Sequence, residues 1–479
     1  ALLRASPHDV EAHVMQAELA LRAGNEGAAT RAIERLAAQP KTAALAHYFR
    51  GRLALASNRL DEAAQAFQAA AAADPPHVLA AIEAAKLKSR AGGDGLAALD
   101  HLFEDRQRDP TEAARADLRA LSLARANLLA EAGKREQAIA ALDAALARDS
   151  DDNAAQLRRG VLALEAGRTD AGRVDLLAVY ERTGGFPGLV GPMSRLYIRS
   201  GELKALEAML QPQLNDARAP DEVVLAVAQL RLAQDSVENA DLMADNVLLR
   251  NPGSWEAHLI KSRVQLARGD LQLAQAELRM ARPKQPDPEV ELTAGKLFER
   301  SGRPQEALAA YRKAHQLAPT LHEATFLHGR MLLQLGRPQD AIAELSAVTK
   351  ATESFPAAFL ALGQAFHDRG NLDEAHRNFQ RAALLAPSLA EAHYWLGRCE
   401  AERKEYAAAV AALGRAVRNA EADPPWLADA YLWLGRAAEA EHDTAAARAA
   451  FESHLRLAPA KSPGRAEAER QLARLGRAP

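Results

Sequence analysis

The 479-residue sequence predicts an all-α protein, and three observations lead to this fold class. Alanine-rich runs, such as Ala63 to Pro76, suit close packing of one helix on another, and aromatic residues make up only 5% of the chain. Runs of β-branched residues, which strands favour, are nearly absent. In addition, small, large and proline residues recur with a period of 34 residues, which is typical of stacked helical repeats.

The repeat is clearest in the segment from Leu362 to Pro387, LGQAFHDRGNLDEAHRNFQRAALLAP. It contains a small residue, Gly363, at a position that we call the landmark of the repeat. An alanine follows the landmark by twelve residues, a large residue by sixteen and a second alanine by nineteen. Landmarks stand at positions 17, 51, 85, 126, 160, 194, 228, 262, 295, 329, 363, 397 and 435. The spacing is 34 except for 41 before 126, 33 before 295 and 38 before 435, so thirteen repeats are predicted.

Each repeat is expected to form two antiparallel helices. The landmark lets the first helix approach the second closely, and the two alanines of the second helix have the same effect from the other side. A proline such as Pro387 ends the second helix because it cannot continue one. This pattern of large residue, Leu-Gly, alanine, aromatic, alanine and proline resembles the tetratricopeptide repeat. The resemblance implies a right-handed superhelical α-solenoid of about thirteen helix-turn-helix repeats, with a concave and a convex face.

One irregular stretch interrupts the array. The segment TGGFPGLVGPM, residues 183–193, has four glycines and two prolines where a first helix should begin, and Pro192 is expected to break that helix. We interpret it as an irregular segment or hinge between an N-terminal sub-array, residues 8–182, and a C-terminal sub-array, residues 194–460. A second departure is the extended turn around Trp426, which is expected to pack on the last repeat or to contact a partner.

The two ends of the chain are interpreted differently. Pro7 stands where a repeat-closing proline belongs, ten residues before the first landmark. Residues 1–7 are therefore expected to be the remnant of the second helix of an upstream repeat in a longer protein. Residues 461–479 are expected to form a capping helix with a polar outer face, which a solenoid needs at its end. The apolar residues of this helix are Ala468, Leu472 and Leu475.

Composition argues against several classes of function. The 60 Lys and Arg residues are balanced by 63 Asp and Glu residues, so a field that would hold nucleic acid is not expected. The single cysteine, Cys399, excludes an intramolecular disulfide and a metal site made of cysteines alone. No apolar run approaches the length of a membrane span, so no membrane insertion is expected in this chain.

Motifs for catalysis or metal binding are also missing. Gly-x-Ser-x-Gly and His-Glu-x-x-His do not occur. The histidines at 13, 47, 258 and 393 fall where the tetratricopeptide family places a large packing residue, and most of the 14 histidines are a repeat or more apart. They are not expected to share one metal ion. We therefore expect no enzyme activity, no catalytic residue, no cofactor and no metal.

The resemblance to the tetratricopeptide family places function on the concave groove, which first-helix residues line. Positions three before the landmark are almost uniformly apolar, and positions one after it are mostly basic. The candidate partner-binding residues are Arg263, Lys296, Arg330, Arg398, Arg436, Leu259, Leu292, Phe326, Leu360, Tyr394 and Leu432. Such a groove suits an extended or helical segment of another protein that carries apolar anchors and acidic groups. The lysines and asparagines with which some members clamp a C-terminal carboxylate are not matched, since only Asn127 stands at the one-after position.

A structural interpretation of the same basic residues competes with this one. Acids recur six residues before the landmark in seven repeats, as at Glu289 and Glu323. These acids could pair with the basic residues of neighbouring helices in an ion-pair array, worth about 0–1 kcal/mol per exposed pair. The two interpretations are compatible, because a ligand can compete for charges that are only loosely paired.

The sequence thus predicts a protein-interaction scaffold within a larger protein, and its Ala- and Arg-rich repeats look bacterial. The first hypothesis is a cytoplasmic adaptor for regulatory or motility-type partners. A second resembles the periplasmic repeat arrays of exopolysaccharide export or envelope assembly, which would place the chain in the periplasm. A third is the substrate-recruiting arm of an enzyme whose catalytic domain lies outside this sequence.

Overall fold

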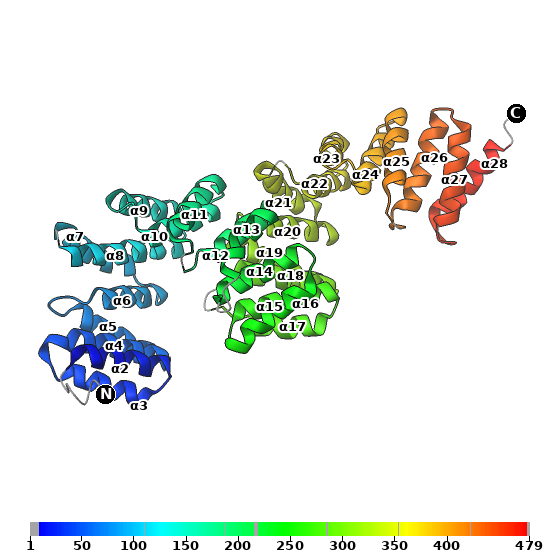
Figure 1. Ribbon diagram of the computed structural model, residues 1–479. Helices are drawn as coiled ribbons and strands as arrows, with labels where there is room; N and C mark the ends of the chain where they lie inside the picture. Colours follow the sequence, from blue (N-terminus) through cyan, green and yellow to red (C-terminus); the bar gives the residue numbers. More distant parts are fainter. Residues whose placement is uncertain are drawn as a thin grey trace. The chain divides into compact units, whose positions relative to one another are not determined.

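The computed structural model describes residues 9–109, 111–185, 187–214, 219–283, 286–352, 354–421 and 423–476. Within these ranges the chain forms twenty-seven α-helices and one short 3-10 helix, and it contains no strand. The all-α prediction is therefore confirmed, and successive helices pack against one another along the chain (Figure 1). The helix remnant expected at residues 1–7 lies outside the described residues.

The chain divides into two compact units, which we call the N-terminal unit (Ala1–Ala226) and the C-terminal unit (Val227–Pro479). The division falls inside one helix, α14 (Asp221–Ala233), whereas the sequence suggested a division at residues 183–193. The irregular segment therefore lies within the N-terminal unit.

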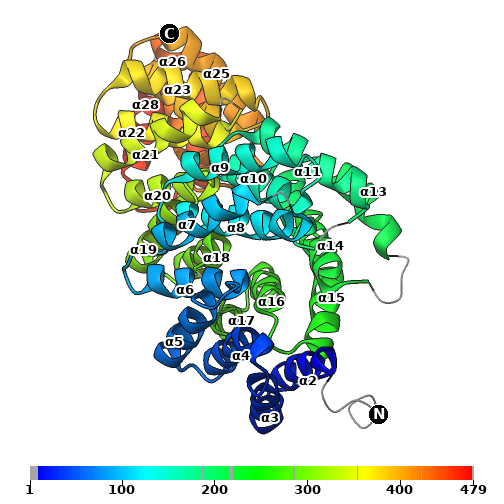
Figure 2. The same ribbon diagram turned by 90° about the vertical axis from the view of Figure 1, so that its left-hand side faces the viewer.

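The N-terminal unit consists of helix pairs, of which α2 to α5 pack together at the blue end of the chain (Figure 2). Its helices before α14 are α2 (Val10–Arg22), α3 (Glu26–Ala37), η1 (Pro40–Thr42), α4 (Ala43–Ala56), α5 (Leu60–Ala71), α6 (Val78–Arg90), α7 (Gly95–Arg108), α8 (Glu112–Glu131), α9 (Arg135–Arg148), α10 (Asn153–Glu165), α11 (Thr169–Thr183), α12 (Val190–Arg199) and α13 (Leu203–Leu214).

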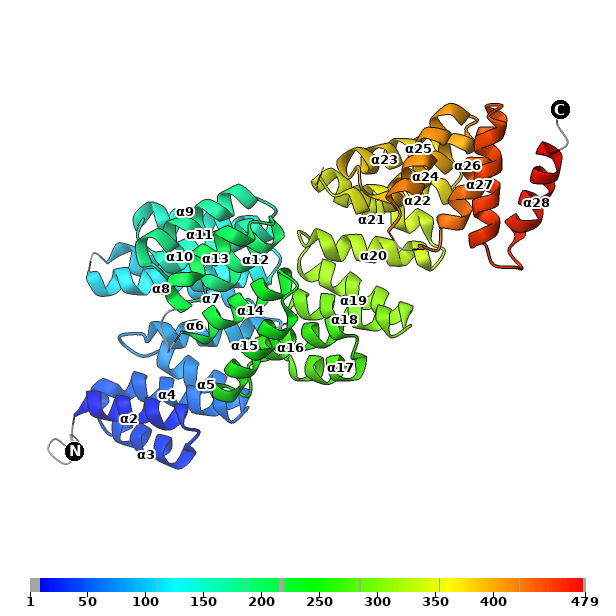
Figure 3. The same cartoon turned by 45° about the vertical axis from the view of Figure 1, so that its right-hand side comes forward.

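The C-terminal unit continues the same arrangement to the end of the described chain, where α26, α27 and α28 lie side by side (Figure 3). Its helices after α14 are α15 (Val237–Arg250), α16 (Trp255–Arg268), α17 (Leu271–Met280), α18 (Pro288–Arg300), α19 (Pro304–Leu317), α20 (His322–Gln334), α21 (Pro338–Ala351), α22 (Pro356–Asp368), α23 (Leu372–Leu385), α24 (Ala390–Glu402), α25 (Tyr406–Asn419), α26 (Leu427–Ala440), α27 (Thr444–Leu457) and α28 (Pro463–Leu475).

The landmarks mark the first helix of every pair. All thirteen lie in even-numbered helices from α2 to α26, and each of those from α2 to α12 and from α16 to α26 packs on the odd-numbered helix that follows it. Four landmarks are glycines that face an aromatic ring sixteen residues later. A Cβ atom at Gly295 would lie only 2.4 Å from the ring of Tyr311, and one at Gly363 would lie 2.5 Å from the ring of Phe379. Where the landmark is alanine or serine, the residue sixteen later is never phenylalanine or tyrosine.

The turn inside each pair has one backbone conformation throughout. The residue seven positions after the landmark has a positive φ in all thirteen repeats. Nine of these residues are glycines, which adopt this conformation at no steric cost. The other four are Asn58, Asp235, Lys404 and His442. For a side chain such as that of Lys404, with φ of 66°, the conformation costs about 1 kcal/mol.

The irregular segment is anchored by a carboxylate. Helix α12 begins at Val190, and Pro192 does not break it. The expectation was wrong because Pro192 lies in the first turn of the helix, where the backbone N–H has no partner within the helix. Glu222 of α14 accepts hydrogen bonds from the backbone N–H groups of Gly188, at 3.0 Å, and Gly191, at 3.1 Å. A hinge at residues 183–193 stays a prediction.

The C-terminal end is closed by α28. Ala468 is fully buried, and Leu472 and Leu475 pack beside it on a cluster that contains Leu432 and Phe451. These contacts cover the apolar side of the last helix pair.

Trp426 precedes α26 and packs on the repeats. Its ring stacks on that of Tyr394 at a centroid distance of 5.2 Å and an interplanar angle of 16°. The packing interpretation of Trp426 is therefore the one that the structure favours.

Candidate functional site

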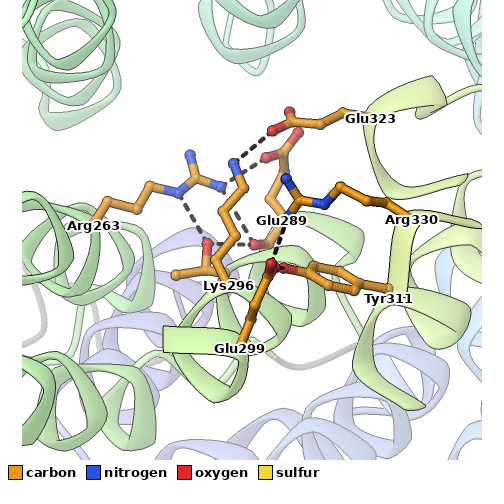
Figure 4. Close-up of polar contacts among 8 residues, drawn as sticks. Arg263, Glu289, Lys296, Glu299, Tyr311, Glu323 and Arg330 are labelled. Atoms are coloured by element: carbon orange, nitrogen blue, oxygen red, sulfur yellow. Dashed lines mark hydrogen bonds and ion pairs between the residues drawn. The ribbon is translucent and has the colours of Figure 1, made fainter. Parts of the chain in front are cut away.

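Basic residues of neighbouring first helices in the C-terminal unit are paired with acids (Figure 4). Arg263 of α16 reaches α18, where its guanidinium lies 2.7 Å from the Glu289 carboxylate and donates to the Thr293 hydroxyl at 3.0 Å. Lys296 of α18 reaches α20, where its ammonium lies 2.6 Å from the Glu323 carboxylate. Each basic side chain thus joins its own first helix to the first helix of the next repeat.

Arg330 of α20 points in the opposite direction along the chain. Its guanidinium donates to Glu299 of α18 at 2.6 Å, and the other oxygen of Glu299 accepts from the Tyr311 hydroxyl at 2.7 Å (Figure 4). Burial and the hydrogen bond to Glu299 raise the pKa of the Tyr311 hydroxyl well above its usual range. Tyr311 therefore stays a neutral hydrogen-bond donor that fixes the orientation of the Glu299 carboxylate.

The same type of link continues beyond α22. Gln364 of α22 donates to Glu391 of α24 at 3.3 Å, and Tyr394 of α24 donates to Asp429 of α26 at 2.7 Å. Finally, Arg436 of α26 donates to Glu467 of α28 through two bonds of 2.7 and 2.6 Å. We call the links from Arg263, Lys296, Gln364, Tyr394 and Arg436 to the next first helix the inter-repeat ladder.

The step from α20 to α22 has an aromatic contact in place of a polar link. The position six before the landmark of α22 holds Ala357, which is not an acid. There Phe326 of α20 contacts Phe355, which precedes α22, at a centroid distance of 4.9 Å. Among the residues that form these steps, Phe326 is also the one apolar candidate that keeps a partly exposed side chain.

The other apolar candidates are core residues. They are Leu259, Leu292, Leu360, Tyr394 and Leu432, each at most 7% exposed. Leu292 packs with Leu321 and Ala324 of the next repeat, and Leu360 packs with Ala392 and Leu396 in the same way. The position three before the landmark therefore faces the neighbouring first helix, and these side chains cannot serve as surface anchors.

The basic candidates of this face are paired with acids. Arg398 bonds within its own helix, with its Nε 3.1 Å from Glu402, so each of the five basic candidates has a carboxylate partner. The expected ion-pair array exists between Arg263 and Glu289 and between Lys296 and Glu323. These pairs are still accessible, since the Lys296 and Glu323 side chains are 43% and 48% exposed.

A hollow of about 450 Å³ lies at the C-terminal end of the inter-repeat ladder. Its walls come from α24, α26, the end of α27 and the start of α28. The residues that line it include Arg398, Asp429, Trp433, Arg436, His454, Ser462 and Glu467. Sequence reasoning missed this hollow, because the return of α28 onto α26 depends on the length of the turn between α27 and α28.

Among the described residues, no group of three or more His, Cys, Asp or Glu side chains could hold a metal ion. Cys399 is buried, and burial raises the pKa of its thiol to about 12, so it is a poor nucleophile. In the part of the chain that the structure describes, no helix combines the length and apolar character that crossing a membrane requires.

A solved structure shares the fold of this chain over nearly its whole length. A chain of the APC/C hetero-tetramer Cut9-Hcn1 aligns over 96% of this chain and 95% of its own length, with a TM-score of 0.60 and 14% sequence identity. PilF of Pseudomonas aeruginosa aligns over 45% of this chain and 97% of its own, with a TM-score of 0.41 and 19% identity. MamA aligns over 38% and 96%, with a TM-score of 0.31 and 24% identity. At these identities the likeness concerns the fold alone.

Sequence comparison gives the family. No curated protein matches the chain in sequence. The tetratricopeptide repeat model matches residues 14–78, 123–186, 225–288, 292–356, 326–375 and 360–424, which together make up more than half of the chain. The chain therefore belongs to the tetratricopeptide repeat family.

Proposed function

We propose that the chain is a protein–protein interaction scaffold, and that the first-helix face of its C-terminal unit binds an extended or helical segment of another protein. The observation that carries this proposal is the inter-repeat ladder. It pairs charged groups of neighbouring first helices, as in Arg263 with Glu289 and Lys296 with Glu323, and leaves them partly exposed. A repeated surface of this kind suits a partner that runs along several repeats.

Acidic groups of the partner would compete with the acids of the ladder. An exposed ion pair contributes only about 0–1 kcal/mol, so exchanging Glu323 for a partner carboxylate on Lys296 costs little. Apolar anchors would use the partly exposed rings of Phe326 and Trp433, since the leucines of the first helices are buried.

Photo-cross-linking tests which face of the repeats binds the partner protein. A benzoylphenylalanine would be placed at Lys296 or Gln364 on first helices, and at Leu249 or Leu384 as matched controls on second helices. The controls are well exposed, at 85% and 68%, so they report on the second helices with at least the access that Lys296 has at 43%. Partner adducts formed from the first-helix positions and not from the controls are expected. Adducts formed from Leu249 and Leu384 alone would move the binding surface to the second helices.

A further inference from the structure

The hollow at the C-terminal end of the ladder contains unused hydrogen-bond donors. Arg436 binds Glu467 through Nε and Nη2, and Arg398 binds Glu402 and the Tyr394 hydroxyl through Nε and Nη1. Within the described residues, Nη1 of Arg436 and Nη2 of Arg398 have no hydrogen-bond partner. Each guanidinium therefore offers two N–H groups in a hollow that both residues line.

Trp433 holds these two guanidinium groups in place. The Arg436 guanidinium lies 4.5 Å from the centre of the Trp433 ring, and that of Arg398 lies 5.6 Å from it. Arg398 also lies 5.1 Å from the ring of Trp395. Cation–π contacts on both sides orient planar groups before any ligand arrives, so less entropy is lost on binding.

Two further polar atoms of the same hollow are unsatisfied. His454 is 3% exposed, and its Nδ1 lies 2.7 Å from the carbonyl oxygen of Ala428. Because a carbonyl only accepts, Nδ1 donates to it, and the second ring nitrogen, Nε2, has no partner. The buried hydroxyl oxygen of Ser462 has none either. Buried polar groups are rarely left unpaired, so such a pair lining one hollow indicates a place for an outside group.

We infer that this hollow is a subsite for an acidic side chain of a partner polypeptide, with an apolar or proline neighbour that packs on Trp433. The inference rests on the proposed scaffold function and names the partner chemistry at one end of the surface. A carboxylate supplies acceptors for the free N–H groups of Arg398 and Arg436, and the peptide backbone supplies an N–H donor. The turn residues Pro425, Pro459 and Pro463 add apolar wall to the hollow.

The other charges of the hollow favour a monoanion over a phosphate group. Asp429 and Glu467 also line the hollow, so a doubly charged ligand would face two carboxylates. The hydrogen bonds from Arg436 hold the pKa of the Glu467 carboxyl below its usual range, which keeps it charged at neutral pH. A single Asp or Glu side chain adds one charge between two cations and meets less repulsion.

A peptide array on the full chain tests this subsite. The probes are N-acetylated, C-amidated octapeptides with one glutamate flanked by proline, leucine or tryptophan, and a matched set with glutamine. Glutamate peptides are expected to bind at least about tenfold more tightly than their glutamine partners, as charge-assisted hydrogen bonds to arginine require. A third set without glutamate but with a free C-terminal carboxylate tests the other source of a carboxylate.

Substitutions inside and outside the hollow test whether the peptides bind there. Arg398→Gln should weaken glutamate-peptide binding about tenfold. Arg173→Gln is the matched control, because Arg173 also pairs with a glutamate, Glu202, and lies 5.3 Å from the ring of Tyr197, but it belongs to the second helix α11 and is outside the hollow. Arg173→Gln should change the affinity less than twofold. Trp433→Phe, which keeps an aromatic face, should retain most of the binding that Trp433→Leu loses.

Several results would overturn the subsite. They are equal binding of glutamate and glutamine peptides, binding of free C-terminal peptides alone, an equal effect of Arg173→Gln and Arg398→Gln, and no binding of any peptide. Cross-links from Lys296 together with any of these results would leave the scaffold function standing and remove only the subsite. Far-ultraviolet circular dichroism of each variant confirms that the fold is unchanged.

Discussion

The repeat α18–α19 and the repeat α12–α13 have the same helical pattern but use different chemistry. In the first, Gly295 accommodates the ring of Tyr311, and Lys296 pairs with Glu323 of the next repeat. In the second, the landmark is Ser194, which is fully buried and donates to the carbonyl of Val190 at 2.8 Å.

The two repeats also differ in the donor that meets the acid six residues before the next landmark. Glu323 accepts from a side chain, whereas Glu222 accepts from the backbone N–H groups of Gly188 and Gly191. The position of the acid recurs, and the donor that it meets depends on the local chain. A loop that replaces the first turns of a helix can therefore be held by the same acid that elsewhere links two helices.

The largest effect on stability is expected from a substitution that disrupts the glycine–aromatic contact of the regular repeat. In Gly295→Ala, the new methyl would clash with the Tyr311 ring, and overpacking of this kind should lower the free energy of unfolding by about 2 kcal/mol. Urea denaturation followed by circular dichroism measures the change. Adding Tyr311→Leu should restore part of the loss, because Ala126 and Leu142 already form such a pair in the sequence. A loss no larger than that of Ser194→Ala, about 1 kcal/mol for one hydrogen bond, would contradict the steric account.

The second test compares the two acids directly. Glu222→Ala removes the acceptor of two backbone N–H groups, and the amides of Gly188 and Gly191 should exchange with solvent about tenfold faster. Glu323→Ala removes an exposed ion pair and should change exchange in α18 and α20 by less than about twofold. Hydrogen-exchange mass spectrometry measures both. If residues 183–193 already exchange rapidly in the unaltered chain, Glu222 does not hold the segment and the hinge interpretation gains support.

A pH experiment contrasts the ladder acids with Glu400, an acid whose one close side-chain contact is from Oε1 to Nε2 of His376 at 3.5 Å. Glu400 of α24 is buried, its Oε2 has no partner, and burial, with a smaller contribution from Glu405, raises the pKa of its carboxyl to about 7. The folded chain therefore keeps a proton that the unfolded chain releases near pH 4.5. The stability gained from that proton is complete below pH 4.5 and is lost as the pH rises through 7.

Glu400→Gln should accordingly stabilise the chain at pH 8 by on the order of 1 kcal/mol and have little effect at pH 4.5. Glu402→Gln is the control, since Glu402 accepts from His367 and Arg398 and its loss should destabilise the chain at pH 8. Thermal unfolding at the two pH values gives the answer. A destabilised Glu400→Gln variant at pH 8 would show that the contact with His376 stabilises the charged carboxylate more than burial destabilises it.

The smallest expected effect concerns the turns. Lys404→Gly should raise the free energy of unfolding by about 0.5 kcal/mol, because glycine removes the strain of a positive φ but gains freedom in the unfolded chain. Gly370→Ala, at the same place in the preceding repeat, should lower it by about 1 kcal/mol. Changes of opposite sign are the signature, and urea midpoints measured in parallel are sufficient. If both substitutions changed the free energy of unfolding in the same direction, strain from a positive φ would not be the cause.

Much of the fold could be predicted from the sequence because it repeats. The landmark spacing located all thirteen helix pairs, since small residues are needed wherever two helices approach closely. The exposure of Leu292 and Tyr394 could not be derived from one repeat, because it depends on how the neighbouring first helix packs. The partners of Arg330 and Arg398 were also not predictable, since a long side chain reaches acids on either side and rotamers select among them. Pro192 was misjudged because its position within the helix depends on where the helix begins.

The turns with positive φ also divide each repeat into a part of fixed length and a part of variable length. From the landmark to the turn the count is seven in every repeat, and the spacings of 41, 33 and 38 therefore arise entirely after the turn. Insertions and deletions during evolution would be accommodated on that return path, where α8 has twenty residues and α17 only ten. For protein engineering, the same asymmetry marks the junctions between a second helix and the next first helix as the places to graft loops, and the inner turns as places to leave unchanged.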